Sequence, residues 1–275
     1  MGPSYAQGFE LEGSRTPLRQ LVGDVWQSRE LIKTLSRKDF YVVYRRASFG
    51  VLWAVAVPLV HAAVISAILS QFVRFEEVSP YPVYVFAGVV AWTFFSAVVT
   101  SGTMSIVSGG DLSTKIYFPR AVFPLVSVGA ACYTLLPGVI VLILATIGFG
   151  VPLSPRLLLL VPACALLVLL GLAFALVLSA LYVYFRDIRF AVQASIIAWF
   201  YATPIIYPIS RTGFAEPFIH ANPMTGVVEL FHEATVGAGG SVVIPLIWTV
   251  AWTSLLLAWG LLLHRKHDRV FSDLL

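Results

Sequence analysis

Six long stretches of this sequence contain no aspartate, glutamate, lysine or arginine. They cover residues 47–73, 82–110, 121–155, 157–185, 190–210 and 240–264. Each is long enough to cross a membrane, because an apolar helix needs about 20 residues to span a hydrocarbon core of about 30 Å. The third stretch ends in glycine and proline at turn-like spacing, so we end that span at residue 149 and expect a turn over 150–156. The pattern predicts an all-α integral membrane protein with six transmembrane helices.

The composition excludes an ordinary soluble domain. Hydrophobic residues make up 59% of the 275 residues and charged residues 12%, whereas soluble proteins carry about 25% charged residues. The two cysteines, Cys132 and Cys164, lie in apolar stretches and match no disulfide or metal-ligand spacing. Lipid is therefore the solvent for most of this chain.

The basic residues indicate how the chain is oriented in the membrane. If residues 1–46 are cytoplasmic, only Arg74, Arg156 and Arg211 of the 18 Lys and Arg lie outside. Cytoplasmic loops carry an excess of such residues, and an odd number of spans would put the basic C-terminal cluster on the wrong side. We expect a cytoplasmic segment 1–46, a six-span domain 47–264 and a cytoplasmic tail 265–275. Anionic lipid accounts for the net charge of +4, so no nucleic-acid partner is expected.

The N-terminal segment has the pattern of an amphipathic helix over about residues 24–38. Leu31, Ile32 and Leu35 fall on one face, and most of the charged residues fall on the opposite face. A basic amphipathic helix just before a span is typical of a helix lying in the membrane interface. The alternative is a cytoplasmic helix packed against a partner.

The connection between the fifth and sixth spans, residues 211–239, contains prolines and glycines but also apolar runs. It is too apolar for a solvated loop and too interrupted for a span. Short re-entrant or gate helices that dip into the outer leaflet would satisfy both features, provided that protein buries their backbone.

Five sequence blocks, in order around the six predicted spans, carry a resemblance to a known family. They are YRRASFGVLWAVAVPL (44–59), KIYFPRAVFPL (115–125), FRDI (185–188), TPIIYP (203–208) and NPMTGVVEL (222–230). The resemblance extends over about residues 28–265. The ordered set resembles the membrane subunit of type-2 ATP-binding-cassette (ABC) exporters of polysaccharides, the O-antigen, teichoic-acid and capsule permeases.

The resemblance implies a homodimer in the bacterial cytoplasmic (inner) membrane that works with two copies of a cytoplasmic ABC ATPase. The substrate would be a polyprenyl-linked glycan, and ATP and Mg would bind to the ATPase, with no cofactor on this chain. The sequence has no phosphate-binding loop and no carboxylate inside a predicted span that would serve as an ion relay. The chain is therefore expected to be a transport subunit and not an enzyme.

Two cytoplasmic loops are the candidates for coupling to the ATPase. The aromatic and basic residues between the second and third spans would seat in an ATPase groove and orient it, and a tight loop follows the fourth span. The alternative is a plain basic loop anchored by aromatics. The candidate coupling residues are Lys115, Tyr117, Phe118, Pro119, Arg120, Arg186 and Asp187.

An outer gate is expected where prolines interrupt the end of the fifth span. Proline frees a backbone carbonyl and kinks a helix, which suits the lip of a gate and equally a simple helix end. The candidates are Pro204, Tyr207, Pro208, Asn222 and Pro223.

Aromatic side chains stack on sugar rings, so some of them would line a glycan channel. Interfacial belts and lipid-facing packing are the alternative for most aromatic residues. The candidates for the channel are Trp92, Phe95, Tyr133, Trp199 and Tyr201.

Two other functions compete with polysaccharide export. One is an ABC permease for drug or small-molecule efflux. The other is a membrane-embedded polyprenyl-phosphate glycosyltransferase, which needs acidic residues near a membrane face to hold a metal or activate a hydroxyl. Its candidates are Asp187, Glu216, Glu229 and Glu233.

Overall fold

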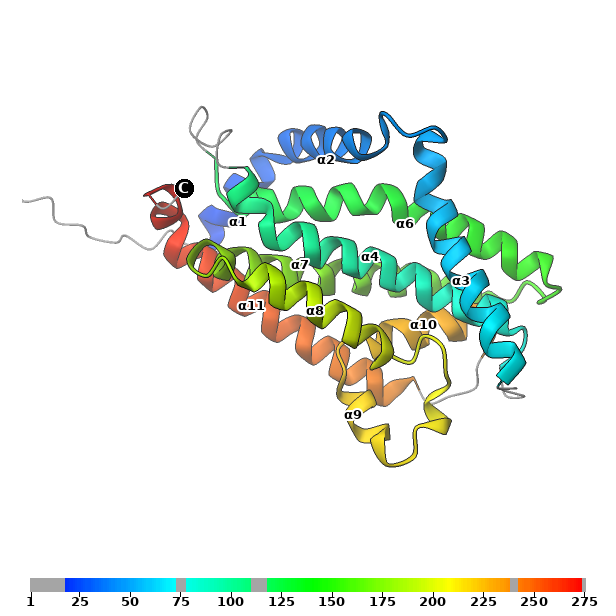
Figure 1. The fold of residues 1–275 in the computed structure, drawn as a ribbon. Helices are drawn as coiled ribbons and strands as arrows, with labels where there is room; N and C mark the ends of the chain where they lie inside the picture. The colour runs from blue at the N-terminus through cyan, green and yellow to red at the C-terminus, as the bar shows by residue number, and fades with distance from the viewer. Residues whose placement is uncertain (1–17, 73–77, 110–117, 238–241, 274–275) are drawn as a thin grey trace, which may run out of the picture.

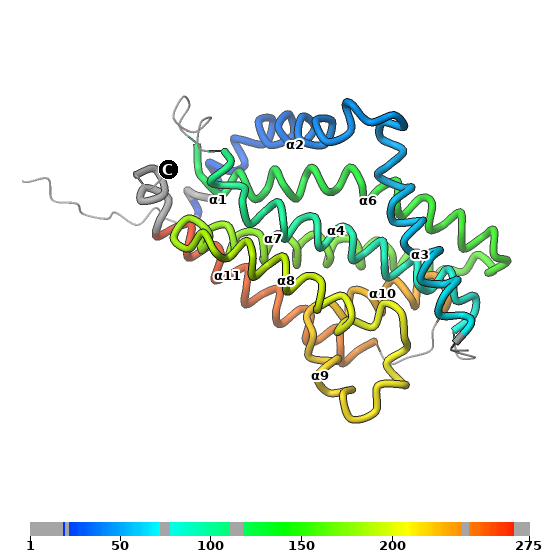
Figure 2. Tube along the Cα trace, in the orientation of Figure 1, coloured from blue at the N-terminus to red at the C-terminus, as the bar shows by residue number. Residues whose placement is uncertain are grey.

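The computed structural model describes residues 18–72, 78–109, 118–237 and 242–273, and every regular element in those ranges is helical (Figures 1 and 2). The α-helices are α1 (Leu18–Gln27), α2 (Arg29–Tyr44), α3 (Trp53–Phe72), α4 (Tyr81–Ser108), α6 (Val122–Gly148), α7 (Leu160–Tyr184), α8 (Ile188–Tyr201), α9 (Glu216–Ala221), α10 (Thr225–Thr235) and α11 (Val243–Asp273). Short 3₁₀ turns are η1 (Gly50–Leu52), η2 (Pro155–Leu159), η3 (Ile209–Arg211) and η4 (Gly213–Ala215). The predicted all-α class is confirmed.

Five of the described helices are long and apolar enough to cross a membrane: α3, α4, α6, α7 and α11. They coincide with five of the six predicted spans. The remaining prediction, a single span over 190–210, is not confirmed, because α8 has 14 residues and a length of about 21 Å. Helix α8 ends at Tyr201 because Pro204 and Pro208 disfavour helical backbone at and before their positions.

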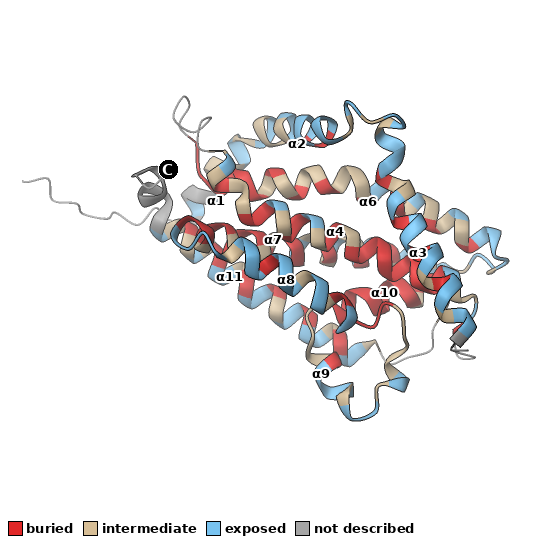
Figure 3. Ribbon diagram, viewed as in Figure 1, coloured by how far each residue is buried: buried red, intermediate tan, exposed pale blue. Residues whose placement is uncertain are grey.

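Helix α4 lies at the centre of the bundle and packs against α3, α6, α7, α8 and α10 (Figure 3). In α4, 78% of the most apolar 18-residue stretch is buried, against 22–33% in the other four spanning helices. Gly102 allows α7 to approach α4 closely, because a Cβ added there would lie 2.6 Å from the Cβ of Ala175 in α7. The core is therefore built around one helix.

Helices α7 and α11 pack side by side and run in the same direction. Gly260 lies against Leu176, and one turn later the His264 ring lies 3.5 Å from the Ser179 hydroxyl. Residue numbers therefore increase in the same direction along both helices, which shows that α7 and α11 are parallel. The chain must return to the other end of the bundle between the two helices, and it does so through α8, α9 and α10 (Figure 1).

The predicted N-terminal helix over 24–38 is present as two helices with a break at Ser28. Asp24 lies inside α1 and does not begin a helix. The apolar side chains Leu31, Ile32 and Leu35 pack against a buried cluster at the ends of α4, α6 and α7. The apolar face of α2 is thus covered by this chain itself.

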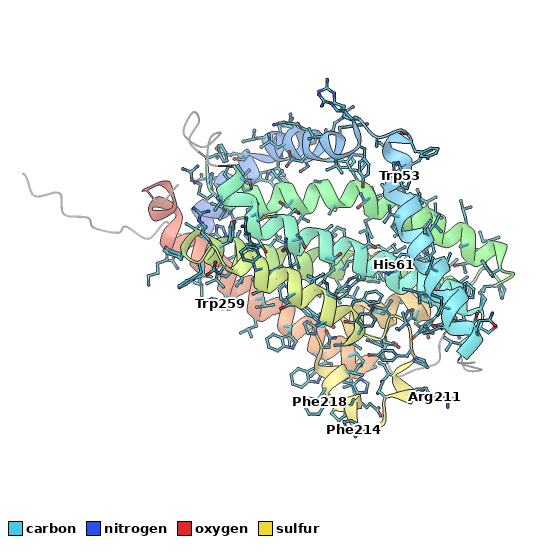
Figure 4. The ribbon with its side chains drawn as sticks, viewed as in Figure 1. Trp53, His61, Arg211, Phe214, Phe218 and Trp259 are labelled. Carbon is cyan, nitrogen blue, oxygen red and sulfur yellow. The ribbon has the colours of Figure 1, made fainter. Side chains whose placement is uncertain are left out.

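Two short helices, α9 and α10, occupy the connection predicted to be interrupted. All residues of α10 except Glu233 are buried, and the helix packs against α4, α7 and α11. The turn η4 and helix α9 form a tip from which Phe214 and Phe218 project, 94% and 78% exposed (Figure 4). One part of this connection therefore belongs to the core and the other lies outside it.

Candidate functional site

Three of the five candidate channel aromatics meet in one buried cluster. Trp92 and Phe95 lie three residues apart on one face of α4, and Trp199 comes from α8. The ring centroids of Phe95 and Trp199 are 5.2 Å apart, and those of Trp92 and Trp199 are 6.3 Å apart, both edge to face. Phe174 of α7 lies 5.3 Å from Trp199. The rings pack directly against one another, and Phe95 is fully buried.

The other two candidate aromatics lie elsewhere. Tyr133 of α6 stacks on Phe40 of α2 with 5.3 Å between the centroids. Tyr201 lies at the end of α8 and is 63% exposed. Helix α3 contributes an unforeseen ring instead, because His61 stacks at 5.5 Å on Phe200, the neighbour of Trp199 (Figure 4).

The irregular segment after α8 is held by hydroxyl groups from the first turn of α4. Tyr84 donates to the carbonyl oxygen of Tyr207 at 3.0 Å and to that of Pro204 at 3.4 Å. Tyr81 donates to the carbonyl oxygen of Ile206 at 2.9 Å. Carbonyls freed from helical bonding are costly to bury without a partner. The two tyrosines therefore stabilise the break that the prolines create.

Asn222 joins the end of α8 to the junction between α9 and α10. Its Oδ1 accepts from Trp199 Nε1 at 2.9 Å and from the Met224 amide at 3.0 Å. Its Nδ2 donates to the Ala202 carbonyl and to the Thr203 hydroxyl, both at 3.0 Å. The amide thus uses both donors and both acceptor positions. Because Trp199 also belongs to the aromatic cluster, Asn222 connects that cluster to the candidate gate.

Two of the candidate gate prolines, Pro208 and Pro223, lie just before new helical turns. Pro208 directly precedes η3, and Pro223 lies two residues before α10. Pro204 is buried, while Tyr207 is half-buried and donates to the Tyr201 carbonyl at 2.8 Å. The structure therefore brings all five candidate gate residues into the connection between α8 and α10.

A buried histidine adjoins the gate and was missed by the sequence analysis. His232 of α10 has no exposed surface, and its ring stacks on Tyr84 with 3.6 Å between the centroids. Its Nδ1 lies 3.6 Å from the Oε1 of Glu229, one helical turn earlier. Two spacings in the sequence could have indicated this contact. Tyr81 and Tyr84 share a face of α4, and Glu229 and His232 share a face of α10.

The candidate coupling residues of the loop between α4 and α6 are buried where they are described. Phe118 is 5% exposed and Arg120 7% exposed, and Pro119 is also buried. The Phe118 ring lies 5.3 Å from that of Phe123, beneath the apolar face of α2. Lys115 and Tyr117 lie outside the described residues.

The second candidate coupling loop is an exposed turn between α7 and α8. Arg186 and Asp187 are both exposed, and the Arg186 guanidinium lies 5.4 Å from the centre of the Tyr182 ring. Val183 shares a buried cluster with Phe118, so the two loops lie at the same end of the bundle. Only the second loop presents charged side chains at the surface among the described coupling residues.

The acidic residues considered for a glycosyltransferase do not come together. Asp187 lies at the end opposite the other three, and each of those has its own nearby side chain: Glu216 with His220, Glu229 with His232 and Glu233 with Arg156. Within the described ranges, no three His, Cys, Asp or Glu side chains form a group that could hold a metal ion.

Comparison with known proteins identifies the family. The model of the ABC-2 type transporter family matches residues 30–235. The chain is 30% identical to an O-antigen export system permease protein RfbA of Myxococcus xanthus, over 70% of this chain and 73% of that protein. It is 28% identical to an O-antigen export system permease protein RfbA of Klebsiella pneumoniae, over 75% of this chain and 82% of that protein. The chain therefore belongs to the ABC-2 type transporter family.

Proposed function

We propose that this chain is the membrane subunit of an ABC transporter that exports a lipid-linked cell-envelope polysaccharide across the bacterial cytoplasmic membrane. The observation that carries the proposal is the similarity to O-antigen export permeases over 70–75% of the chain, within a family match to residues 30–235. Two copies of the chain form the pore, and two copies of a cytoplasmic ATPase bind ATP and Mg and supply the energy.

The chain crosses the membrane a sixth time through α8 and the segment that follows it. The parallel packing of α7 and α11 supports this, because two helices with the same direction need a return crossing between them. Helix α8 covers about 21 Å of the required 30 Å, and the irregular segment over 202–208 continues outward. Its carbonyls bond to tyrosine hydroxyls of α4, so protein supplies the partners that lipid lacks.

Both termini lie in the cytoplasm. Residues of α2, the ends of α4 and α7, the start of α6 and Leu263 of α11 share one buried cluster, which supports a common side for the basic segments. The exposed turn with Arg186 and Asp187 then contacts the ATPase directly. Phe118, buried beneath α2, and the buried Arg120 transmit the motion of α2 to α4 and α6, and α2 lies at the membrane interface.

The outer gate is the connection from α8 to α10, and the hydrogen bonds of Asn222 hold it closed. ATPase closure would tilt α7 and α8 through their shared turn, and this motion strains the bonds from Asn222 to Trp199 and Thr203. Separation of the aromatic cluster then exposes ring faces to passing sugars. Helices α9 and α10 act as the gate helices at the outer leaflet.

Charge reversal at the exposed turn tests this proposal. Asp187→Lys is expected to prevent stimulation of the cognate ATPase and export of the glycan to the cell surface. Glu216→Lys, an exposed charge reversal at the other end of the bundle, is the matched control and is expected to retain stimulation of the ATPase. The assays are ATP hydrolysis by the purified complex and surface glycan in a deletion strain that expresses each variant.

Three outcomes would refute the proposal. They are ATP hydrolysis by the purified chain without a partner, normal surface glycan in the deletion strain, and equal effects of the two charge reversals. A deletion strain that gains drug sensitivity while its surface glycan stays normal would instead identify a drug efflux permease.

A further inference from the structure

A groove of about 620 Å³ opens between the N-terminal helices and α6. One wall is the stretch of α6 from Leu125 to Leu136, and the other comes from α1 and α2. The two walls are in contact where Ser36 donates to the Val126 carbonyl at 3.1 Å, where Gly129 leaves no room for a Cβ, and where Tyr133 stacks on Phe40. The groove is the space beside these contacts.

The length of the α6 wall matches one leaflet of a bilayer. Leu125 and Leu136 are eleven residues apart, which corresponds to about 17 Å of helix. Half of a hydrocarbon core of about 30 Å is about 15 Å. The wall begins near the end of α6 that carries the buried Phe118 cluster, which is the cytoplasmic end in the proposed orientation. A single acyl chain of the inner leaflet therefore fits along it.

The charges of the groove are confined to the wall opposite α6. Arg29 and Lys33 line it from α2, one turn apart on the same face, while the α6 sequence over 121–149 has no charged residue. The nearby acids Asp24 and Glu30 do not line the groove. Cations on one wall and an apolar surface on the other complement an anionic headgroup with a hydrocarbon tail.

A tryptophan marks the level of the headgroups. Trp26, at the end of α1, lines the groove and is 70% exposed. The Arg29 guanidinium lies 5.7 Å from the centre of its ring. Tryptophan is enriched at the boundary between hydrocarbon and headgroups, so Trp26 and Arg29 fit a position beside a lipid phosphate.

We propose that this groove binds one anionic glycerophospholipid of the cytoplasmic leaflet, with its phosphate between Arg29 and Lys33 and an acyl chain along α6. The proposal rests on the orientation given under the proposed function. The lipid fills the gap beside the contact of Ser36 with α6, so it holds α1 and α2 against the bundle.

The test is native mass spectrometry of the full chain in complex with its cognate ATPase, with phosphatidylglycerol as the probe and phosphatidylethanolamine as the competitor. The wild-type complex is expected to retain phosphatidylglycerol preferentially. The double variant Arg29→Gln and Lys33→Gln is expected to bind it about thirtyfold more weakly, because each basic side chain near an anionic surface contributes about 1 kcal/mol.

The matched control is Arg37→Gln with Lys38→Gln, which removes the same charge from the same helix. Neither residue lines the groove, and the Arg37 guanidinium lies over the Tyr41 ring at 5.6 Å. This control is expected to retain the lipid like the wild type. A loss equal to that of the first double variant would overturn the site and leave only general attraction to a charged surface.

A second variant, Cys132→Trp, fills the groove from the α6 side without changing its charge. It is expected to lose phosphatidylglycerol, and it decides the question if the charge variant does not assemble with the ATPase. Retention of phosphatidylglycerol by Cys132→Trp, or no preference for phosphatidylglycerol in the wild type, overturns the proposal.

Displacement of phosphatidylglycerol by a polyprenyl diphosphate would also overturn it and would make the groove a substrate site. Lipid retention is measured without export. A failure of the lipid-site proposal can therefore be distinguished from a failure of the proposed function.

Discussion

Helices α3 and α4 are similarly apolar, adjacent in sequence and both long enough to span a membrane, yet they have opposite surroundings. In α4, 78% of the most apolar stretch is buried, and in α3 only 22%. On α3, Val57, Val60, Val64 and Ile68 form an exposed stripe at helical spacing. The neighbour of that stripe is lipid or another protein. On α4, glycine, tyrosine and phenylalanine meet five other helices. Hydropathy alone thus does not reveal which helix organises the bundle.

The largest difference between the two helices is expected from a bulky substitution at a small residue. Gly102→Leu should prevent assembly, because a Cβ at this position would lie 2.6 Å from the Cβ of Ala175 and 3.3 Å from its Cα. Overpacking typically lowers stability by about 1–3 kcal/mol. We expect a loss at or above the upper end of this range, because the added side chain of α4 would meet the backbone of α7. Ala63→Leu on the exposed side of α3 is the control. The measurement is the yield of monodisperse protein and its melting temperature in detergent. Equal tolerance of both changes would contradict the central place of α4.

An intermediate effect is expected from truncation within the aromatic cluster. Phe95→Ala removes a fully buried ring that contacts Trp199 and Phe174, which should lower the free energy of unfolding by about 3 kcal/mol. Val60→Ala removes a side chain that is 59% exposed on α3 and should leave the melting temperature nearly unchanged. A large effect of Val60→Ala would show instead that a partner covers α3 in the purified protein.

The smallest effect is expected from the loss of a single hydroxyl. Tyr84→Phe leaves the carbonyls of Tyr207 and Pro204 without their donor, at a cost of about 1–2 kcal/mol. Ser70→Ala on α3 also removes a hydroxyl bonded to a carbonyl, that of Ala67 at 3.2 Å, but at an exposed position. Thermal unfolding should separate the two variants. Identical melting temperatures would mean that the segment over 202–208 does not depend on α4.

The sequence predicted five spanning helices to within a few residues, except at the start of α3 and the end of α11. Residues 82–110 correspond to α4 (Tyr81–Ser108), and residues 121–149 to α6 (Val122–Gly148). A charge-free stretch flanked by polar residues determines such a helix almost alone. The same criterion failed over 190–210, because apolar composition does not distinguish a helix from irregular backbone whose carbonyls are bonded by distant side chains. The donors, Tyr81 and Tyr84, lie more than 100 residues earlier.

The candidate site was predicted best where the spacing of residues along one helix places their side chains on the same face. Trp92 and Phe95 share a face of α4 and meet Trp199, whereas Tyr133 belongs to the contact with α2. The sequence marks Asn222 as part of the NPMTGVVEL block, but its bonds to Trp199 and Thr203 depend on tertiary packing. Phe118 was expected at a surface and is buried, because α2 folds back over it. An amphipathic pattern predicts an apolar face, but it does not identify the surface that covers that face.

The parallel arrangement of α7 and α11 has a consequence for biosynthesis. Adjacent helices in a hairpin can pair as soon as the second one leaves the ribosome, but α7 receives its partner only after 58 further residues, when Val243 is reached. Until Gly260 arrives, the surface of α7 around Leu176 has no α11 to cover it. Termination or cleavage before α11 therefore leaves a bare helix face within the bilayer, where quality-control proteases of the membrane can recognise an unfinished subunit.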